Sequence, residues 1–342
     1  MPTIEKIATL ANVSRSTVSR VINNDPDVKE ETRTRVKQVI EQIDYRPNLA
    51  ARRLAGGQVG VIGLLLPMPV STLFIDPFFS LVIQGVCGTA NGLDYSVMLW
   101  LAEPEYERRT IRHFLQTHMI DGVIIGSMLI DDPLLEALVE SNRPFILVGR
   151  YLANDEVSYV DVDNQAAAND VVSHLFHNGY RRIGTITGPI NMIAGFDRLE
   201  GFKSGMAVHS LAIEDNLVAY GDFTEHGGYS AMLKLLPLHP EAVFIASDTM
   251  AIGALRAIKE AGLRVPEDIG IASFDDMPFA AQTDPPLTSV RQPIQRFGEV
   301  AVQTLIDMIG HPNAEPRHII LPTELMERGS SGSNHSLSKK GG

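Results

Sequence analysis

The sequence predicts an α/β protein that begins with a small all-helical unit. Two patterns support this prediction. In the N-terminal part of the 342 residues, up to about residue 45, apolar residues recur at helical spacing in three successive stretches. Beyond Gly57, short apolar runs alternate with amphipathic stretches, which is typical of a mostly parallel sheet covered by helices on both faces.

The N-terminal unit is predicted to contain three helices. The first begins at Thr3, which can act as an N-cap, and ends before Asn12-Val13, because Asn tolerates the left-handed conformation that a tight turn between helices needs. Ser14 can cap the second helix, and the third runs from about Lys29 to Asp44. Their apolar faces are formed by Ile4, Ile7, Ala8 and Ala11 in the first helix, Val18, Val21 and Ile22 in the second, and Val36, Val39, Ile40 and Ile43 in the third.

The segment that follows, Asn48 to Gly57, is a short linker. It is long enough for two helical turns, which Asn48 can cap and the glycines at its end can stop. Isolated helices shorter than about 12 to 15 residues rarely hold in water, so we expect this one to form only when a partner stabilises it.

The body of the chain is predicted to alternate strands with helices. Buried strands are expected at Val59–Leu66, Tyr95–Leu101, Val123–Ile125, Phe145–Val148, Ile183–Thr187, Val218–Tyr220, Val243–Ala246 and Ile269–Phe274. Helices are expected at Phe79–Gly92, Glu105–Thr117, Asn164–Asn178, Phe196–His209, Gly227–Leu235, Thr249–Ala261 and Ile294–Gly310. Such sheets bind ligands at the carboxyl ends of their strands. We therefore predict a unit at 1–47, a linker at 48–57, a body at 58–328 and a disordered Ser/Gly/Lys-rich tail at 329–342.

Composition argues against a membrane protein and against a secreted, disulfide-bonded one. The hydrophobic fraction is 44% and the charged fraction 20%, and the longest apolar run, Val59–Val70, is shorter than the roughly 18 residues of a membrane helix. Charged and polar residues interrupt every candidate signal-peptide core near the N-terminus. The single cysteine, Cys87, cannot form an internal disulfide and lies among apolar residues, which favours a core position over a nucleophile. We expect a cytoplasmic protein.

Charge is divided unevenly along the chain. The net charge is −12, yet residues 1–57 carry a net charge of +3 and the remainder −15. Contacts with phosphate need local positive potential, while an acidic body resists non-specific binding. This asymmetry is typical of a small DNA-reading unit attached to an acidic body.

Four motifs of this sequence resemble the LacI/GalR (lactose-repressor) family of bacterial transcription regulators. They are Ser16-Thr17-Val18-Ser19-Arg20-Val21-Ile22-Asn23, Tyr45-Arg46-Pro47-Asn48, Gly262-Leu263-Arg264-Val265-Pro266-Glu267-Asp268-Ile269 and Phe274-Asp275-Asp276. The similarity spans about residues 2 to 328, and it departs from the family where Asn12 replaces a Gly and Lys29 a common Ser cap.

The resemblance implies a helix-turn-helix headpiece, a hinge helix, and a core like the type I periplasmic binding proteins. That core would consist of two Rossmann-like subdomains joined by three crossovers, with an effector in the cleft between them and a second copy of the chain completing a homodimer. The N-subdomain would comprise about 58–161 with part of 291–328, and the C-subdomain about 162–290 with part of the end.

The second helix of the N-terminal unit is predicted to read DNA. In a helix-turn-helix the first residues of the second helix reach base edges in the major groove, so Arg15 and Ser16 are the expected base contacts. Arg20 is expected to point into the same groove. The alternative is that both arginines merely form a solvated face. Residues assigned to the DNA backbone, or to packing, are Thr3, Ser14, Thr17, Ser19, Asn23 and Tyr45 in the headpiece, with Asn48, Arg52 and Arg53 in the linker.

Leu54 is the linker residue of greatest interest. The resemblance implies that, paired with its dimer mate, it wedges between central base pairs in the minor groove. The alternative is that Leu54 packs on the body.

Effector contacts are expected from side chains that follow the predicted strands. Phe79 and Phe223 offer aromatic faces, and Arg198, Asp248 and Asp275 offer charges, with Arg150 a further possibility. A set of carboxylates and arginine suits vicinal hydroxyls, because each group can hold two oxygens. Alternatively, the two aspartates are helix N-caps, Phe223 is a core residue and Arg198 forms a surface ion pair. Ser247 stands where many relatives carry Asn, so whether this position makes a polar contact with the ligand is left open.

The sequence thus favours a repressor that binds palindromic double-stranded operator DNA and responds to a sugar or sugar derivative. An effector would close or twist the cleft and so shift the population of DNA-binding dimers. A purine-like or other metabolite acting as co-repressor, and a solute-binding protein that binds no DNA, remain alternatives. An enzyme is disfavoured, because no G-x-S-x-G, P-loop or G-x-G-x-x-G motif occurs and the ten His show no metal-ligand spacing. No cofactor, metal or membrane partner is expected.

Overall fold

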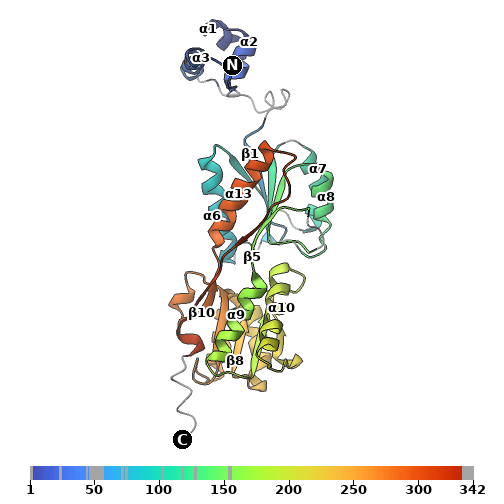
Figure 1. The fold of residues 1–342 in the computed structure, drawn as a ribbon, viewed down its shortest axis with the longest axis vertical. Coiled ribbons are helices and arrows are strands. Elements are labelled where there is room, and N and C mark those ends of the chain that lie inside the picture. Colours follow the sequence, from blue (N-terminus) through green and yellow to red (C-terminus); the bar gives the residue numbers. More distant parts are fainter. Residues whose placement is uncertain are drawn as a thin grey trace. The chain divides into compact units, whose positions relative to one another are not determined.

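The computed structural model describes residues 3–22, 25–43, 45, 58–70, 73, 76–101, 104–117, 119–126, 129–152 and 156–332. Contacts between residues divide the chain into two compact units, 1–59 and 60–342, which we describe separately (Figure 1). The predicted linker, residues 48–57, lies entirely outside the described residues. Among those residues no helix is both long enough and apolar enough to cross a membrane.

The first unit is a three-helix headpiece. Its helices are α1 (Ile4–Leu10), α2 (Arg15–Ile22) and α3 (Glu30–Gln42), with a core of Ile7, Ala11, Val18, Val21, Val36 and Val39. Asn12 has a φ of 49°, which confirms the predicted left-handed turn between α1 and α2. The Oγ1 atom of Thr3 accepts a hydrogen bond from the amide of Lys6 at 3.3 Å, and Oγ of Ser14 accepts one from the amide of Thr17 at 3.1 Å. Both predicted caps are thus in place.

The described part of the second unit contains two six-stranded sheets. The first has the order β11-β5-β4-β3-β1-β2 and is entirely parallel; the second has the order β12-β10-β9-β8-β6-β7, with only the β10–β12 pair antiparallel. Their strands are β1 (Val61–Leu65), β2 (Ser96–Trp100), β3 (Gly122–Gly126), β4 (Phe145–Val148), β5 (Tyr159–Val162), β6 (Ile183–Thr187), β7 (Val218–Tyr220), β8 (Ala242–Ile245), β9 (Gly270–Asp275), β10 (Thr288–Arg291), β11 (His318–Leu321) and β12 (Glu324–Met326).

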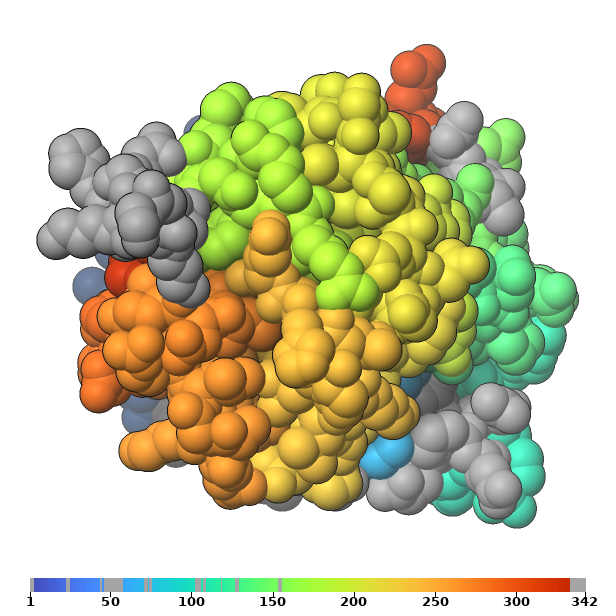
Figure 2. Space-filling view, turned by 90° about the horizontal axis from the view of Figure 1, so that it is seen from below, coloured from blue at the N-terminus to red at the C-terminus, as the bar shows by residue number. Residues whose placement is uncertain are grey.

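Helices cover both faces of each sheet. They are α6 (Pro77–Gly92), α7 (Pro104–Gln116), α8 (Leu134–Glu140), α9 (Asn164–His177), α10 (Ile193–Val208), α11 (Glu225–Leu235), α12 (Asp248–Glu260) and α13 (Ile294–Gly310). On the first sheet α6 pairs with α13 and α7 with α8; on the second, α9 pairs with α10 and α11 with α12. Figure 2 shows the end of the second unit that contains the second sheet, where the green residues of α9 lie beside the yellow residues of α10. Each subdomain therefore has an apolar core on either side of its sheet.

The two sheets exchange segments of chain. Among the described residues the chain passes from one sheet's subdomain to the other's three times: between β5 and α9, between β10 and α13, and between β11 and β12 (Figure 1). These are the predicted crossovers. We call the β1 sheet with its helices the N-subdomain and the β6 sheet with its helices the C-subdomain.

The helices α6 and α13 meet backbone to backbone. A Cβ atom on Gly85 would overlap the carbonyl oxygen of Gln295, and one on Gly298 would overlap that of Val82. Only glycine fits at such a contact, so the spacing of this helix pair is fixed by the main chain.

The prediction of a disordered tail beyond residue 328 is wrong for its first residues. Gly329–Ser331 forms a 3₁₀ turn in which Ser330 and Ser331 are fully buried. The hydroxyl of Ser330 donates to the carbonyl of Ile271 at 2.7 Å and accepts from the amide of Thr288 at 2.8 Å. Bonds to strands far away in sequence hold this turn, and a serine- and glycine-rich composition does not reveal them.

Candidate functional sites

A small cavity lies between the two subdomains, at the carboxyl ends of their strands. Its volume is about 50 Å³, and its walls come from the ends of β4 and β5, the starts of α6, α9 and α10, and the crossover after β10. The lining residues are Phe78, Val148, Gly149, Asp161, Asn164, Met192, Ile193, Ala194, Arg198, Gln292 and Phe297. This is the position that the sheet rule predicts for a ligand.

Arg198 is the central polar group of the cavity. Its side chain is buried, and its guanidinium donates to Oδ1 of Asn164 at 2.9 Å, to the carbonyl of Ala246 at 2.6 Å and to Oδ1 of Asp275 at 3.3 Å. Burial lowers the pKa of Arg198, and the carboxylate of Asp275 opposes that shift. The alternative of a surface ion pair is wrong for Arg198.

Two buried carboxyl groups accompany this arginine. Asp275, at the end of β9, accepts a hydrogen bond from Nε2 of Gln292 at 2.6 Å, and burial raises its pKa to about 8 against the opposing effect of Arg198. Asp161, at the β5 side, accepts bonds from the amides of Arg150 and Val162, and burial raises its pKa to about 6. Carboxyl and guanidinium groups side by side can accept from and donate to the same hydroxyl-rich ligand.

Arg150 and Asp197 join the two subdomains directly. The Nε atom of Arg150, which follows β4, donates to Oδ2 of Asp197 on α10 at 2.6 Å, and its Nη2 atom donates to Oδ1 of the same carboxylate. The predicted effector residue Arg150 is thus held in a bidentate ion pair beside the cavity and is not among the residues that line it.

Phe79, the predicted aromatic effector contact, does not line the cavity. Phe79 is 5% exposed and belongs to the apolar core of the N-subdomain, whereas its neighbour Phe78 lines the cavity. Asp76 caps α6 and accepts from the amide of Phe78 at 3.0 Å, which fixes the phase of this first turn. Consecutive helical residues point about 100° apart, so one phenylalanine faces the cavity and the next the sheet.

Phe223 does not line the cavity either. It has a φ of 64° and packs against the apolar core of the C-subdomain, and its ring occupies the space where a Cβ on Gly188 would lie. Its ring centre is 6.0 Å from the guanidinium carbon of Arg198, at the limit of a cation–π contact. Phe223 is thus partly buried against the core of the C-subdomain.

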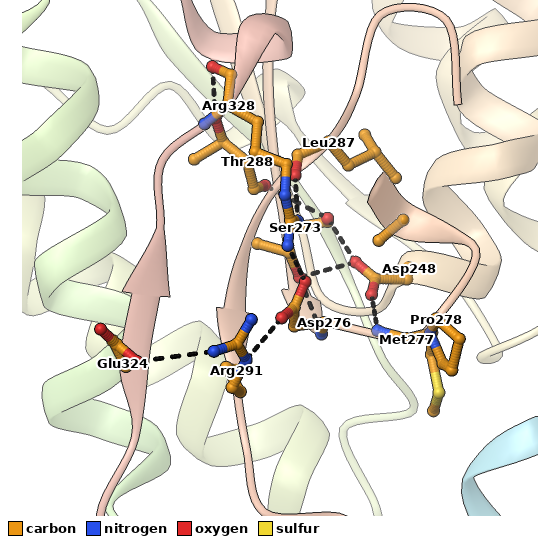
Figure 3. Close-up of polar contacts among 12 residues, drawn as sticks. Asp248, Ser273, Asp276, Met277, Pro278, Leu287, Thr288, Arg291, Glu324 and Arg328 are labelled. Atoms are coloured by element: carbon orange, nitrogen blue, oxygen red, sulfur yellow. Dashed lines mark hydrogen bonds and ion pairs between the residues drawn. The ribbon is translucent and has the colours of Figure 1, made fainter. Parts of the chain in front are cut away.

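Asp248, another predicted effector contact, does not line the cavity. Asp248 is fully buried, and its carboxylate accepts bonds from the hydroxyls of Ser273 and Ser289 at 2.5 and 2.7 Å and from the amide of Met277 at 2.6 Å (Figure 3). Burial raises its pKa to about 6. The N-cap of α12 is Ser247, which accepts from the amide of Met250. Asp248 ties α12 to β9, β10 and the loop after β9.

Asp276 is a connecting residue that the sequence did not reveal. Its carboxylate accepts from Arg328 at 2.6 Å and from Arg291 at 2.7 Å, and Arg291 also lies 3.7 Å from a carboxylate oxygen of Glu324 (Figure 3). These partners stand at the ends of two crossovers. Asp275 therefore bonds to Arg198 and Gln292, two residues that line the cavity, while the next residue binds the crossing segments.

The residues predicted to read DNA lie on the exposed side of α2. The side chain of Arg15 is 72% exposed and 3.2 Å from Glu5, and that of Arg20 is 65% exposed and 3.8 Å from Asp25. Ser16 is exposed, with its Oγ 2.7 Å from Oγ of Ser14. Exposed ion pairs of this kind are worth little, so the arginines are available to other partners.

The remaining predicted DNA contacts are placed in part. Thr3 is exposed, and Thr17, Ser19 and Tyr45 are half-buried; burial raises the pKa of Tyr45, and Glu5 adds to the shift. Asn23, Asn48, Arg52, Arg53 and Leu54 lie outside the described residues. Among the described residues no group of His, Cys, Asp or Glu is arranged to hold a metal ion.

Comparison with known proteins assigns families to both units. The profile of "Bacterial regulatory proteins, lacI family" matches residues 3–48, and that of "Periplasmic binding protein-like domain" matches residues 172–331. The chain is 38% identical to the HTH-type transcriptional regulator CelR of Thermobifida fusca, over 96% of this chain and 98% of that protein. It is 34% identical to the ribose operon repressor of Escherichia coli (strain K12), over 97% of this chain and 100% of that protein.

Two solved structures resemble the whole chain. A complex of the transcriptional regulator CelR with cellobiose has a TM-score of 0.77 and 36% identity, covering 96% of this chain and 100% of that one. The lac repressor dimer bound to operator and the anti-inducer ONPF has a TM-score of 0.81 and 26% identity, covering 97% and 99%.

Proposed function

Because the chain belongs to the LacI family of bacterial regulatory proteins, and is a DNA-binding transcriptional regulator with a small-molecule effector, we propose that its effector is a sugar or sugar derivative and that it acts as a repressor. The effector binds in the cavity between the subdomains. We place its action in the cytoplasm, where operator DNA is found.

The buried group around Arg198 carries this proposal. The guanidinium of Arg198, the carboxyl of Asp161 and the amides of Asn164 and Gln292 line the cavity, and Phe78 and Phe297 supply apolar walls. The carboxyl of Asp275 bonds to Arg198. Sugars present hydroxyls at their edges and apolar C–H groups on their faces, so they match such a mixed lining. The names of the relatives point the same way, since one solved complex contains cellobiose and one relative is a ribose operon repressor.

The DNA side of the proposal assigns roles to exposed residues of the headpiece. Arg15, Ser16 and Arg20 read bases of each half-site in the major groove, and two headpieces of a homodimer bind a palindromic operator. Leu54 of the linker enters the minor groove at the centre of the operator. The other predicted polar residues of headpiece and linker position the protein on phosphates.

Isothermal titration calorimetry with ribose, glucose, cellobiose and adenosine tests the effector class. We expect saturable binding of one sugar, and loss of that binding by about tenfold or more in Arg198→Met, since a hydrogen-bonded charge in a buried site contributes about 1.5–3 kcal/mol. Arg256→Met is the matched control, because Arg256 forms an exposed ion pair with Glu225 away from the cavity. Binding of adenosine alone would replace the sugar by a purine-like effector.

Gel-shift titration with palindromic DNA selected from a random pool tests the DNA side. We expect the bound sugar to weaken operator binding and Leu54→Ala to weaken it strongly, while the calorimetric affinity for sugar stays unchanged. Operator affinity that is the same in Leu54→Ala as in the parent chain would contradict the role given to the linker.

A further inference from the structure

Two sets of bonds connect the subdomains beside the effector cavity. The first is the bidentate pair between Arg150 of the N-subdomain and Asp197 of the C-subdomain. The side chain of Asp197 is 2% exposed and that of Arg150 is 26% exposed. Shielded, bidentate arginine–carboxylate pairs are among the stronger polar contacts in proteins.

The second set of bonds is made by the main chain. Leu129 of the N-subdomain and Met192 of the C-subdomain form an isolated antiparallel bridge, in which the amide of Ile130 donates to the carbonyl of Asn191 at 2.7 Å. These residues stand after β3 and β6, on the same side of the cavity as Arg150. The bridge closes the cleft independently of any side-chain charge.

The cavity behind these bonds is too small for a sugar. Its volume of about 50 Å³ compares with roughly 300–1,000 Å³ for small-molecule sites in proteins. A sugar can therefore enter only if the subdomains separate, and separation breaks both sets of bonds.

We propose that the Arg150–Asp197 pair and the Leu129–Met192 bridge form a latch that holds the cleft shut against the effector. The inference rests on the proposed function, because it concerns access to the same cavity. A latch of this kind reduces the apparent affinity for the effector by the fraction of molecules that are open. It sets the concentration of sugar at which the regulator responds, without touching the sugar.

The position of the pair separates this role from ligand binding. Neither Arg150 nor Asp197 lines the cavity of about 50 Å³, and Arg150 lines only a smaller one of about 20 Å³ beside it. The carboxylate of Asp197 is already shared between Arg150 and Nε2 of Gln165, which donates at 2.9 Å. Removing Arg150 alone would leave a buried, partly unpaired charge and could unfold the chain. The double variant Arg150→Met with Asp197→Asn removes both charges, and the amide oxygen that it introduces can still accept the bond from Gln165.

Hydrogen exchange tests the latch without any ligand. In the double variant the amide of Ile130 should exchange about tenfold faster than in the parent chain, the factor expected when one charge-assisted bond is lost. The matched control is Arg182→Met with Glu214→Gln, which removes a bidentate pair, with bonds of 2.7 Å, that lies within the C-subdomain. Unchanged exchange at Ile130 in the double variant would overturn the proposal.

A disulfide provides the opposite change. Leu129→Cys with Met192→Cys, in a Cys87→Ser background, places two thiols on directly opposed residues of an antiparallel pair, at a spacing that a disulfide can bridge. We expect the oxidised protein to bind the sugar found by calorimetry at least tenfold more weakly than the same protein after reduction. Equal affinity in the two states would overturn the latch. Should no sugar bind the parent chain while exchange at Ile130 still accelerates in the double variant, the effector class fails and the latch stands.

Discussion

Two neighbouring phenylalanines, Phe78 and Phe79, perform different tasks because a helix turns by about 100° per residue. Phe79→Ala should lower the free energy of unfolding by about 3–5 kcal/mol, the usual cost of removing a buried phenylalanine, and leave the effector dissociation constant unchanged. Phe78→Ala should instead weaken effector binding by about tenfold. Urea unfolding and calorimetry of both variants check this pair, and equal effects on binding would contradict it.

The buried carboxyl of Asp248 makes stability depend on pH in an unusual direction. Burial raises its pKa from 3.8 to about 6, so between these values the folded chain holds a proton that the unfolded chain has released. The free energy of unfolding therefore falls as pH rises through this window, by up to about 1.4 kcal/mol per pH unit for each such group.

Asp248→Asn removes that titration. The variant should show a flatter dependence of the free energy of unfolding on pH between about 4 and 6, measured by urea titration at several pH values. Its effector affinity should equal that of the parent chain, because Asp248 does not line the cavity. Parallel stability curves for variant and parent would show that Asp248 is ionised throughout.

Among the elements, we expect the short turn Gly329–Ser331 to contribute strongly to the free energy of unfolding. Deleting residues 329–342 removes the two bonds of Ser330 and leaves the amide of Thr288 and the carbonyl of Ile271 without these partners inside the C-subdomain. We expect a loss of about 2 kcal/mol or more, since each unpaired buried group costs about 1–3 kcal/mol. Thermal unfolding measures it, and deletion of 333–342 alone serves as control, with no expected change.

The elements also show how far sequence reasoning reaches. The helix Ile294–Gly310 is predicted to the residue because its apolar positions follow the helical period without a break. The strands β5, β10, β11 and β12 are missed, since polar residues interrupt their short apolar runs: Asp161 in β5, Thr288 in β10, His318 in β11 and Glu324 in β12. Their burial comes from neighbouring strands that no local pattern reveals.

The same limit applies to the cavity. Arg198 is found from its position after an apolar run, and it lines the cavity as expected. Asp161 and Gln292 are missed, because they belong to a strand and to a crossover that local patterns do not predict. Asn164 is missed although it opens a predicted helix, because the strand before that helix is not predicted. Asp248 does not line the cavity, since a chain position at a strand end does not tell which side of the sheet a carboxylate faces.

For the whole molecule, charge decides how the two units cooperate with DNA. The region up to residue 57 carries only +3, and the rest −15. Specific binding should therefore be sensitive to salt: between 50 and 200 mM salt we expect the operator affinity to fall by about 10³-fold or more, the loss typical of six or more phosphate contacts. Gel-shift titration across this range measures the fall. Calorimetric sugar affinity over the same range should stay nearly constant, and a parallel fall would point to a non-specific effect of salt.

The backbone contact between Gly85 and Gly298 has a mechanical consequence. At Gly85 and Gly298 no side chain separates α6 from α13, so this contact has nothing to repack when the cavity opens or closes. When a ligand binds, we therefore expect α6 and α13 to move together as one rigid unit. The bending that permits this movement falls on the three segments that follow β5, β10 and β11.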